Sequence, residues 1–130
     1  DLIRVPEYKP GREEATRIEY RSPDPACNPY LTFSVMLAAG LEGIEKGYEV
    51  PAPVEENVYE MNEAERKERG IATLPASLAE AVELTEKSKV VRKALGEHIF
   101  NAFIKNKKIE CDLYRTQVTD YEIKRYLPIL

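Results

Sequence analysis

The sequence has few of the residues that build small metal sites: its 130 residues include only two cysteines and one histidine. Cys27 and Cys111 lie far apart, and neither belongs to a CxxC motif or to a cluster with histidine. This spacing excludes a conventional zinc motif. We expect two buried or half-buried thiols of a cytosolic protein. His98, the single histidine, is interpreted as a structural residue in the first turn of a helix.

Long apolar runs and an excess of cations are also missing. The apolar stretch over residues 30–41 is short and is interrupted by Thr32 and Ser34, so we expect no membrane association. The formal net charge of −4 argues against a nucleic-acid partner. The lysine-rich run Lys105–Lys108 is interpreted as a solvated helix face. The chain begins at Asp1 inside a strand-like run, without an initiator Met or a signal-peptide pattern, so we expect part of a longer protein.

Strand-forming residues gather at the start of the chain, and helix patterns dominate the rest. Residues 2–6 and 15–21 are rich in β-forming side chains and flank a charged loop with Pro10 and Gly11, which predicts an antiparallel pair. The composition, 43% hydrophobic and 32% charged, is ordinary for a globular chain. The predicted fold class is α+β: a short antiparallel strand pair followed by a mainly α-helical C-terminal region.

Capping residues and apolar spacing predict the helices. The first helix is expected to begin after Asn28 and Pro29 and to stop near Gly47. Its apolar residues cover every face, so we expect it to be buried nearly all round. A stop at Gly96 separates two helices further along. The later helices are expected to begin at polar caps: Asn62, Ser77, Ser88 and Thr119.

The most informative segment is the alternating run over residues 17–21. Side chains alternate faces along a strand, so Arg17, Glu19 and Arg21 share one face. A carboxylate between two guanidiniums can bind a hard divalent cation, while the arginines can hold phosphate or carboxylate oxygens. Spacing alone favours a simpler interpretation, a solvent-facing ladder of ion pairs. Arg4 adds a third cation if the strand register brings it to the same side.

A longer set of motifs resembles a known enzyme family. The strings LIRVP and RIEYRSPDPACNPYL, starting at Leu2 and Arg17, are similar to the closing strands of the catalytic barrel of type I glutamine synthetase. The string MLAAGLEGI is similar to the helix that follows, and NVY, LPASL and LGEH keep the family order further on. The resemblance spans essentially the whole chain and reverses the preference for an idle ion-pair ladder.

The resemblance implies a division of the chain into three parts. Residues 1–27 correspond to the last strands of the catalytic β-barrel, and residues 28–112 to the helical part of the catalytic domain. Residues 113–130 correspond to a helical tail that contacts a neighbouring subunit. A tail docked on its own domain is the alternative.

The resemblance also implies an activity. Glutamine synthetase is an ATP-dependent glutamate–ammonia ligase that forms L-glutamine from L-glutamate and ammonia through γ-glutamyl phosphate, in nitrogen assimilation. The resemblance further implies a bound Mg²⁺ or Mn²⁺ ion, a cytoplasmic location and a dodecamer of two hexameric rings. This chain, the C-terminal part, is expected to be inactive alone. The alternative is a non-catalytic oligomerisation or regulator-binding module.

Individual residues take roles from the resemblance. It implies that Glu19 binds a divalent metal and that Arg21 binds the substrate glutamate and is catalytic, near the transferring phosphate. Arg4 and Arg17 correspond to arginines that bind the phosphates of ATP. Some relatives carry a basic residue near the position of Glu14, where the family has a nucleotide contact. Because this chain has an acid there, no nucleotide contact is assigned to Glu14.

Tyr59 corresponds to a tyrosine that some bacterial relatives adenylylate. Its loop setting and acidic neighbours favour exposure. The nearby runs EMN and GIATLP are more similar to the feedback-inhibited branch, where this switch is not expected. We therefore favour an unmodified surface tyrosine over a modification site.

Overall fold

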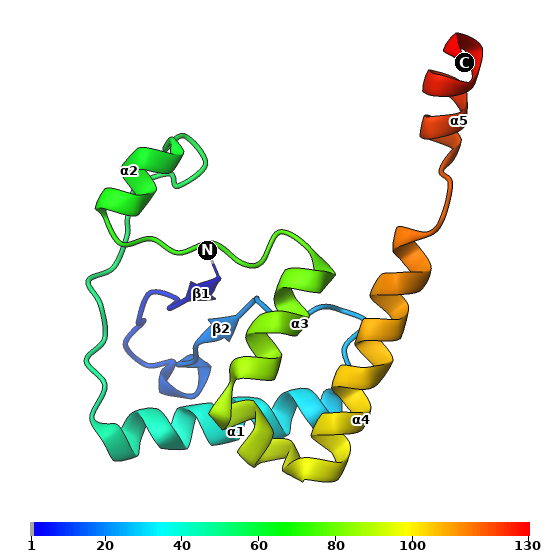
Figure 1. Ribbon diagram of the computed structural model, residues 1–130. Coiled ribbons are helices and arrows are strands. Elements are labelled where there is room, and N and C mark those ends of the chain that lie inside the picture. The colour runs from blue at the N-terminus through cyan, green and yellow to red at the C-terminus, as the bar shows by residue number, and fades with distance from the viewer. Residues whose placement is uncertain (1) are drawn as a thin grey trace.

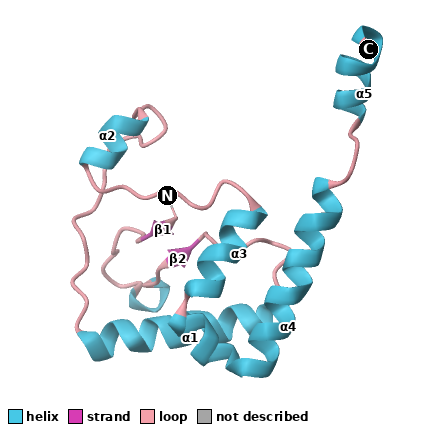
Figure 2. Cartoon of the chain, viewed as in Figure 1, coloured by secondary structure: helices cyan, strands magenta, loops and turns pink. Residues whose placement is uncertain are grey.

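A two-stranded antiparallel ribbon opens the chain in the computed structural model, which describes residues 2–130 (Figure 1). Strand β1 (Ile3–Arg4) pairs with β2 (Glu19–Tyr20), and the register places Ile3 opposite Tyr20 and Arg4 opposite Glu19. Both strands are shorter than the predicted runs 2–6 and 15–21, and Ala15, the first residue of the second run, belongs to the 3₁₀ helix η1 (Glu13–Ala15). The antiparallel pairing and the α+β class are confirmed (Figure 2).

Helix α1 (Pro29–Lys46) begins and ends where the capping residues predict. The Asn28 side chain accepts hydrogen bonds from the backbone N–H groups of Tyr30 and Leu31, and Pro29 occupies the first helical position, where no N–H is needed. Gly47 ends the helix in the left-handed conformation, with φ of 61°. This conformation favours glycine because it has no Cβ.

The prediction that this helix is buried nearly all round is wrong for the described chain. One side of α1 packs against α4, and α4 is its one partner among the elements of residues 2–130. A second side carries large apolar residues with exposed fractions of 50–80%. This exposed stripe consists of Tyr30, Phe33, Leu37, Leu41 and Ile44.

Four further helices follow, each with the predicted cap. They are α2 (Glu63–Glu68), α3 (Leu78–Lys87), α4 (Lys89–Arg115) and α5 (Asp120–Tyr126), and the 3₁₀ turn η2 (Leu127–Ile129) closes the chain. Asn62 and Thr119 form complete capping boxes. The predicted stop at Gly96 appears as a kink within α4, where φ is 72° and ψ is 158°.

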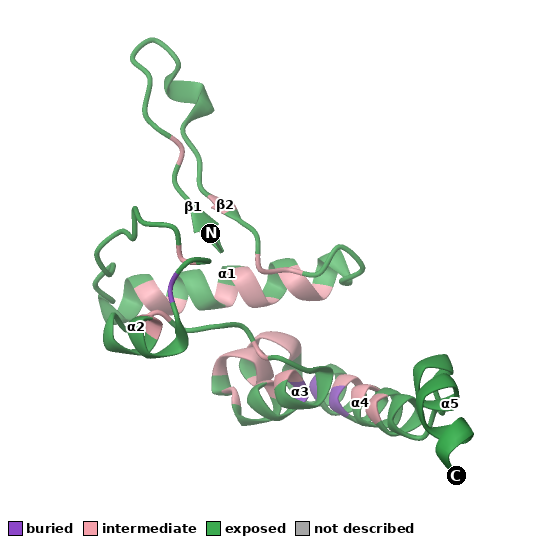
Figure 3. Cartoon of the chain, turned by 90° about the horizontal axis from the view of Figure 1, so that it is seen from above, coloured by how far each residue is buried: buried purple, intermediate pink, exposed green. Residues whose placement is uncertain are grey.

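The apolar core lies between α3 and α4 (Figure 3). Val82 of α3 packs against Phe100 and Ile104 of α4, and Phe100 is only 1% exposed. Cys111 is half-buried against this core, as predicted, whereas Cys27 is exposed because it lies in the turn that precedes α1. The core therefore stabilises the helical region and leaves the ribbon outside it.

The C-terminal helix stands apart from the rest of the chain (Figure 1). Among the described elements, α5 contacts only η2. Tyr121 and Leu127 are 69% and 64% exposed. Within residues 2–130, α5 thus packs on no other helix. None of the helices in residues 2–130 has the length and apolar character needed to cross a membrane.

Candidate active site

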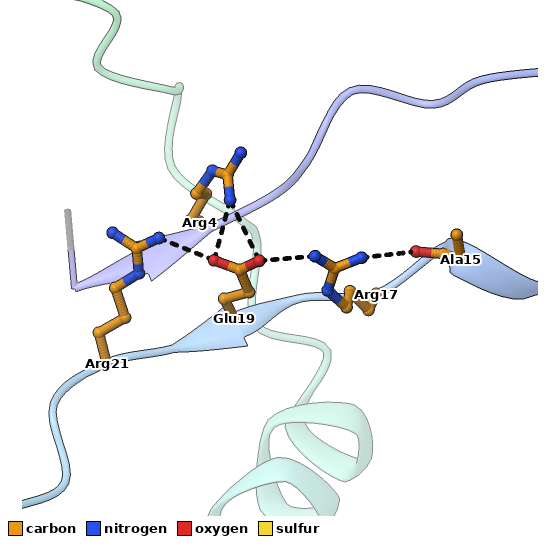
Figure 4. A network of polar contacts seen from close by, with 5 residues as sticks. All are labelled: Arg4, Ala15, Arg17, Glu19 and Arg21. Carbon is orange, nitrogen blue, oxygen red and sulfur yellow. Dashed lines mark hydrogen bonds and ion pairs between the residues drawn. The ribbon is translucent and has the colours of Figure 1, made fainter.

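Three arginines converge on one carboxylate at the ribbon (Figure 4). Arg4 donates from Nη1 to both oxygens of Glu19, at 3.1 Å to Oε1 and 3.0 Å to Oε2. Arg17 donates from Nη2 to Oε1 at 2.9 Å, and Arg21 donates from Nη2 to Oε2 at 2.8 Å. We call these four residues the Arg–Glu cluster. They are the four residues that the sequence singled out for phosphate, glutamate and metal binding.

Local structure explains the convergence. Alternation along β2 and its flanking residues places Arg17, Glu19 and Arg21 on one face. The strand register sets Arg4 directly opposite Glu19, which confirms that the third arginine reaches the same side. The Arg21 backbone N–H donates to the Leu2 carbonyl at 2.7 Å, which holds the ends of the two strands together. The cluster is thus a product of the ribbon alone.

The cluster carries an excess of positive charge. The Arg21 guanidinium, followed by those of Arg4 and Arg17, lowers the pKa of Glu19 to about 2, because each donates a hydrogen bond to the ionised carboxylate. The three arginine side chains are about half exposed, whereas that of Glu19 is 24% exposed. One carboxylate cannot neutralise three guanidiniums, so the site can attract an anion.

A divalent metal needs more oxygen ligands than this cluster has. Mg²⁺ takes six oxygen ligands in near-octahedral geometry, and Glu19 is the one carboxylate among the four residues. Within residues 2–130, no group of three or more His, Cys, Asp or Glu side chains converges on a point. Both Glu19 oxygens also accept from arginines. The described residues can contribute one metal ligand and cannot form a complete metal site.

A cavity of about 310 Å³ lies beside the cluster, between β1 and the loop that leads to β2. Its charged and aromatic lining consists of Arg4, Glu7, Tyr8, Lys9, Arg12 and Arg17. Four cations thus face one carboxylate, which extends the positive region of the cluster. Lys9 and Arg12 were not singled out by sequence reasoning, because the only signal was a charged loop around Pro10 and Gly11.

The remaining candidate residues lie outside the cluster. Tyr59 is in the loop before α2 and is 87% exposed, which agrees with its predicted exposure. His98 is exposed on α4, two residues after the kink at Gly96. In the lysine-rich run, Lys107 pairs with Glu110 at 2.5 Å and Lys108 pairs with a carboxylate of α3 at 2.7 Å, as expected for a solvated face.

Comparison with known proteins identifies the relatives of this chain. The family model described as "Glutamine synthetase, catalytic domain" matches residues 1–126. Glutamine synthetase of Mycolicibacterium smegmatis is 51% identical over 128 residues, which are 98% of this chain and 29% of that protein. Glutamine synthetase of Methanococcus voltae is 52% identical over 128 residues, again 98% of this chain and 28% of that protein.

Similarity extends to a solved structure and to a further bacterial sequence. Glutamine synthetase of Thermotoga maritima is 52% identical over 126 residues, or 97% of this chain and 28% of that protein. A solved structure described as "Apo GmaS without ligand" superposes with a TM-score of 0.66 at 32% identity, over 85% of this chain and 25% of that one. The chain therefore spans less than a third of the length of these relatives. The resemblance inferred from the sequence is confirmed: the chain belongs to the glutamine synthetase family.

Proposed function

We propose that this chain is the C-terminal part of a type I glutamine synthetase that supplies one wall of its phosphoryl-transfer site. The single observation that carries the proposal is the convergence of Arg4, Arg17 and Arg21 on Glu19. Phosphoryl transfer depends chiefly on positioning and on neutralising the charge of the transferring group, for which guanidiniums are well suited. Membership of the family connects this general chemistry to a specific reaction.

The reaction is the ATP-dependent synthesis of L-glutamine. The γ-carboxylate oxygen of L-glutamate attacks the γ-phosphorus of ATP, ADP leaves, and γ-glutamyl phosphate forms. Ammonia then attacks the γ-carbonyl carbon, loses a proton and displaces inorganic phosphate. In this proposal Arg21 orients glutamate and faces the transferring phosphoryl group, while Arg4 and Arg17 hold the phosphates of ATP through charge-assisted hydrogen bonds.

Glu19 would act as one ligand of a bound Mg²⁺ or Mn²⁺ ion whose other ligands come from elsewhere in the full-length protein. Such an ion, when bound, supplies Lewis-acid stabilisation of phosphoryl oxygens. Within this chain, the arginines keep Glu19 ionised and oriented. A carboxylate held in the ionised form is the form that a cation can bind.

The proposal extends to assembly and location. Residues 1–27 belong to the closing strands of the catalytic barrel, residues 28–112 to its helical part and residues 113–130 to a tail that contacts another subunit. The exposed apolar side chains of α5 support a role in contact. We propose a cytoplasmic dodecamer of two hexameric rings for the full-length protein. Tyr59 is proposed as an unmodified surface residue.

Substitution of Arg21 tests the role in glutamate binding and phosphoryl transfer. In the full-length protein, Arg21→Lys should raise KM for L-glutamate and lower kcat by about a hundredfold, because lysine cannot reproduce the planar fork of donors. Arg69→Lys is the matched control, since Arg69 is also half exposed and paired with a carboxylate, Glu56, at 2.6 Å. Unchanged kinetics in Arg21→Lys would refute the assigned role.

Substitution of Glu19 tests the metal assignment. Glu19→Ala should abolish turnover in the full-length protein and raise the metal concentration needed for any remaining activity. Glu14→Ala serves as control, because Glu14 lies in η1 outside the Arg–Glu cluster. Normal metal-dependent activity in Glu19→Ala would defeat the assignment.

A second candidate function is a non-catalytic module for oligomerisation or regulator binding. It is favoured by the exposed apolar side chains of α1 and α5. The two hypotheses differ for the 130-residue chain alone. The enzyme hypothesis expects no turnover with ATP, L-glutamate and ammonia, and polydisperse association through unpaired strand edges. A tight oligomer of defined size in sedimentation experiments would favour the interaction module.

A further inference from the structure

The loop between β1 and β2 is closed by one carboxylate, that of Glu13. Its Oε1 atom accepts a hydrogen bond from the Tyr8 hydroxyl at 3.1 Å and another from the Gly11 backbone N–H at 3.0 Å. Gly11 has φ of 77°, a left-handed conformation that glycine adopts without strain. The carboxylate thus joins the two sides of a tight turn. We call this arrangement the Glu13 clip.

The clip lies at the edge of the cationic cavity: Tyr8 lines the cavity, and Glu13 does not. Tyr8 and Gly11, the two residues that Glu13 holds, are the immediate neighbours of Lys9 and Arg12. Lys9, Arg12 and Tyr8 line the cavity, whereas Glu13 does not. Glu13, which does not line the cavity, thus contacts the direct sequence neighbours of two cations that do.

Little else supports this loop. Every residue from 7 to 18 is exposed, and within residues 2–130 the ribbon packs on no helix. The Arg12 N–H donates to the Lys9 carbonyl at 3.1 Å, which forms the turn, and the Thr16 N–H donates to the Glu13 carbonyl at 3.0 Å. A loop without apolar packing relies on such local hydrogen bonds for its shape.

We propose that Glu13 is a positioning residue that holds Lys9 and Arg12 toward the phosphates of the bound nucleotide. The inference rests on the proposed function, because Arg4 and Arg17, which line the same cavity, are the proposed phosphate ligands. Hydrogen bonds from its own backbone N–H, from Gly11 and from Tyr8 lower the pKa of Glu13, so the clip is ionised and intact at neutral pH.

Electrostatics alone and a positioning role predict opposite changes in nucleotide affinity when Glu13 is removed, so the direction of the change distinguishes them. Glu13 is an anion beside a cationic cavity, so its removal should tighten the binding of a polyphosphate if only long-range electrostatics mattered. A positioning role predicts weaker binding, because the freed loop must be ordered when the ligand binds. Glu14, the next residue of η1, carries the same charge and does not line the cavity, so Glu14→Ala measures the electrostatic contribution alone.

The experiment compares ATP binding by full-length variants, through KM for ATP and through calorimetric titration with ATP. Glu13→Ala should raise both KM and Kd about fivefold, the effect of about one net hydrogen bond. Its kcat should stay within about twofold of the parent, since Glu13 does not touch the transferring group. Tyr8→Phe should weaken ATP binding in the same direction. Glu13→Gln should restore most of the affinity, because an amide oxygen can accept both hydrogen bonds.

Each outcome supports or overturns a specific claim. Unchanged or tighter ATP binding in Glu13→Ala, as in Glu14→Ala, would overturn the positioning role. ATP binding by Arg4→Ala and Arg17→Ala distinguishes a failure of the positioning role from a failure of the proposed nucleotide site. If these arginine variants bind ATP weakly and Glu13→Ala does not, only the clip is wrong. If the arginine variants bind ATP normally, the proposed nucleotide site itself is wrong.

Discussion

The ribbon and the helical pair α3–α4 are stabilised by different interactions. The pair is built around Phe100, which is 1% exposed and packs with Val82 and Ile104. In the ribbon, Ile3 and Ile18 are 60% and 69% exposed, and the side chains meet through ion pairs and hydrogen bonds instead. The hydrophobic effect thus stabilises the α3–α4 pair, whereas ion pairs and hydrogen bonds organise the ribbon.

This difference shows how the chain separates stability from chemistry. Buried apolar contacts carry no charge that salt can screen or pH can titrate, whereas half-exposed ion pairs are weakened by both. The functional side chains nevertheless lie on the ribbon, because groups that bind phosphate must remain accessible and charged. We therefore expect mutations in the helical pair to change the free energy of unfolding and mutations in the ribbon to change ligand binding.

The largest expected effect on stability comes from Phe100. Phe100→Ala should lower the free energy of unfolding by about 3–5 kcal/mol, because it leaves a cavity in the core. It also removes an aromatic ring whose centre lies 4.1 Å from the Arg92 guanidinium carbon. Urea denaturation followed by circular dichroism measures the change. Ile99→Ala is the control: Ile99 is 45% exposed, and its loss should be about 1 kcal/mol. Equal losses would contradict the assigned core.

The kink in α4 gives the next effect. Gly96 has φ of 72°, so Gly96→Ala should destabilise the chain by about 1–3 kcal/mol, because an L-residue is strained there. Gly40→Ala is the matched substitution within α1, where an added Cβ meets no atom within 4 Å. It should stabilise by about 0.5–1 kcal/mol. Thermal unfolding of both variants tests the pair, and a shift of the same sign in both would exclude a required kink.

The ribbon should respond to pH where the helical pair does not. Since the folded pKa of Glu19 is about 2 against 4.5, its ionised form is favoured by folding. The resulting stabilisation is complete above pH 4.5 and is lost as pH falls toward 2. NMR titration of the Glu19 side-chain carboxyl should therefore show a midpoint near 2, and Arg21→Gln should move the midpoint upward. A midpoint near 4.5 in the parent chain would show that the cluster does not form.

The smallest effect is expected for an ion pair within the helical region. Lys108 of α4 donates to Glu86 of α3 at 2.7 Å, and both side chains are about half exposed. A double-mutant cycle with Lys108→Met and Glu86→Gln should give a coupling energy below about 1 kcal/mol. The coupling should fall further in 1 M salt. A larger coupling that resists salt would mean that charge also organises this region.

Local patterns allowed much of the structure to be predicted. Asn28 and Thr119 cap helices where predicted, because a cap is a contact between residues two or three apart in sequence. Gly96 likewise interrupts the helix at the predicted place. Burial was harder to predict. The apolar residues of the exposed stripe on α1 are not buried, because burial depends on which distant elements pack against a helix and not only on its own composition.

The candidate site shows the same division. Alternation alone placed Arg17, Glu19 and Arg21 on one face, because a strand has a period of two. The contribution of Arg4 required the pairing register, since nothing within one strand specifies its partner residue. The Glu13 clip and the cationic cavity were also not predicted from the sequence, because the side chains of a loop with glycine and proline follow no regular period.

The amino-acid sequence by itself determined the family, the positions of the helix caps and the shared face of Arg17, Glu19 and Arg21 along β2 and its flanking residues. These features depend on neighbours within a few residues, or on the order of motifs along the chain. Tertiary structure alone decided that Arg4 faces Glu19, that Phe100 is the centre of the core and that the stripe on α1 stays exposed. Each of these depends on contacts between residues distant in sequence, which local periodicity does not specify.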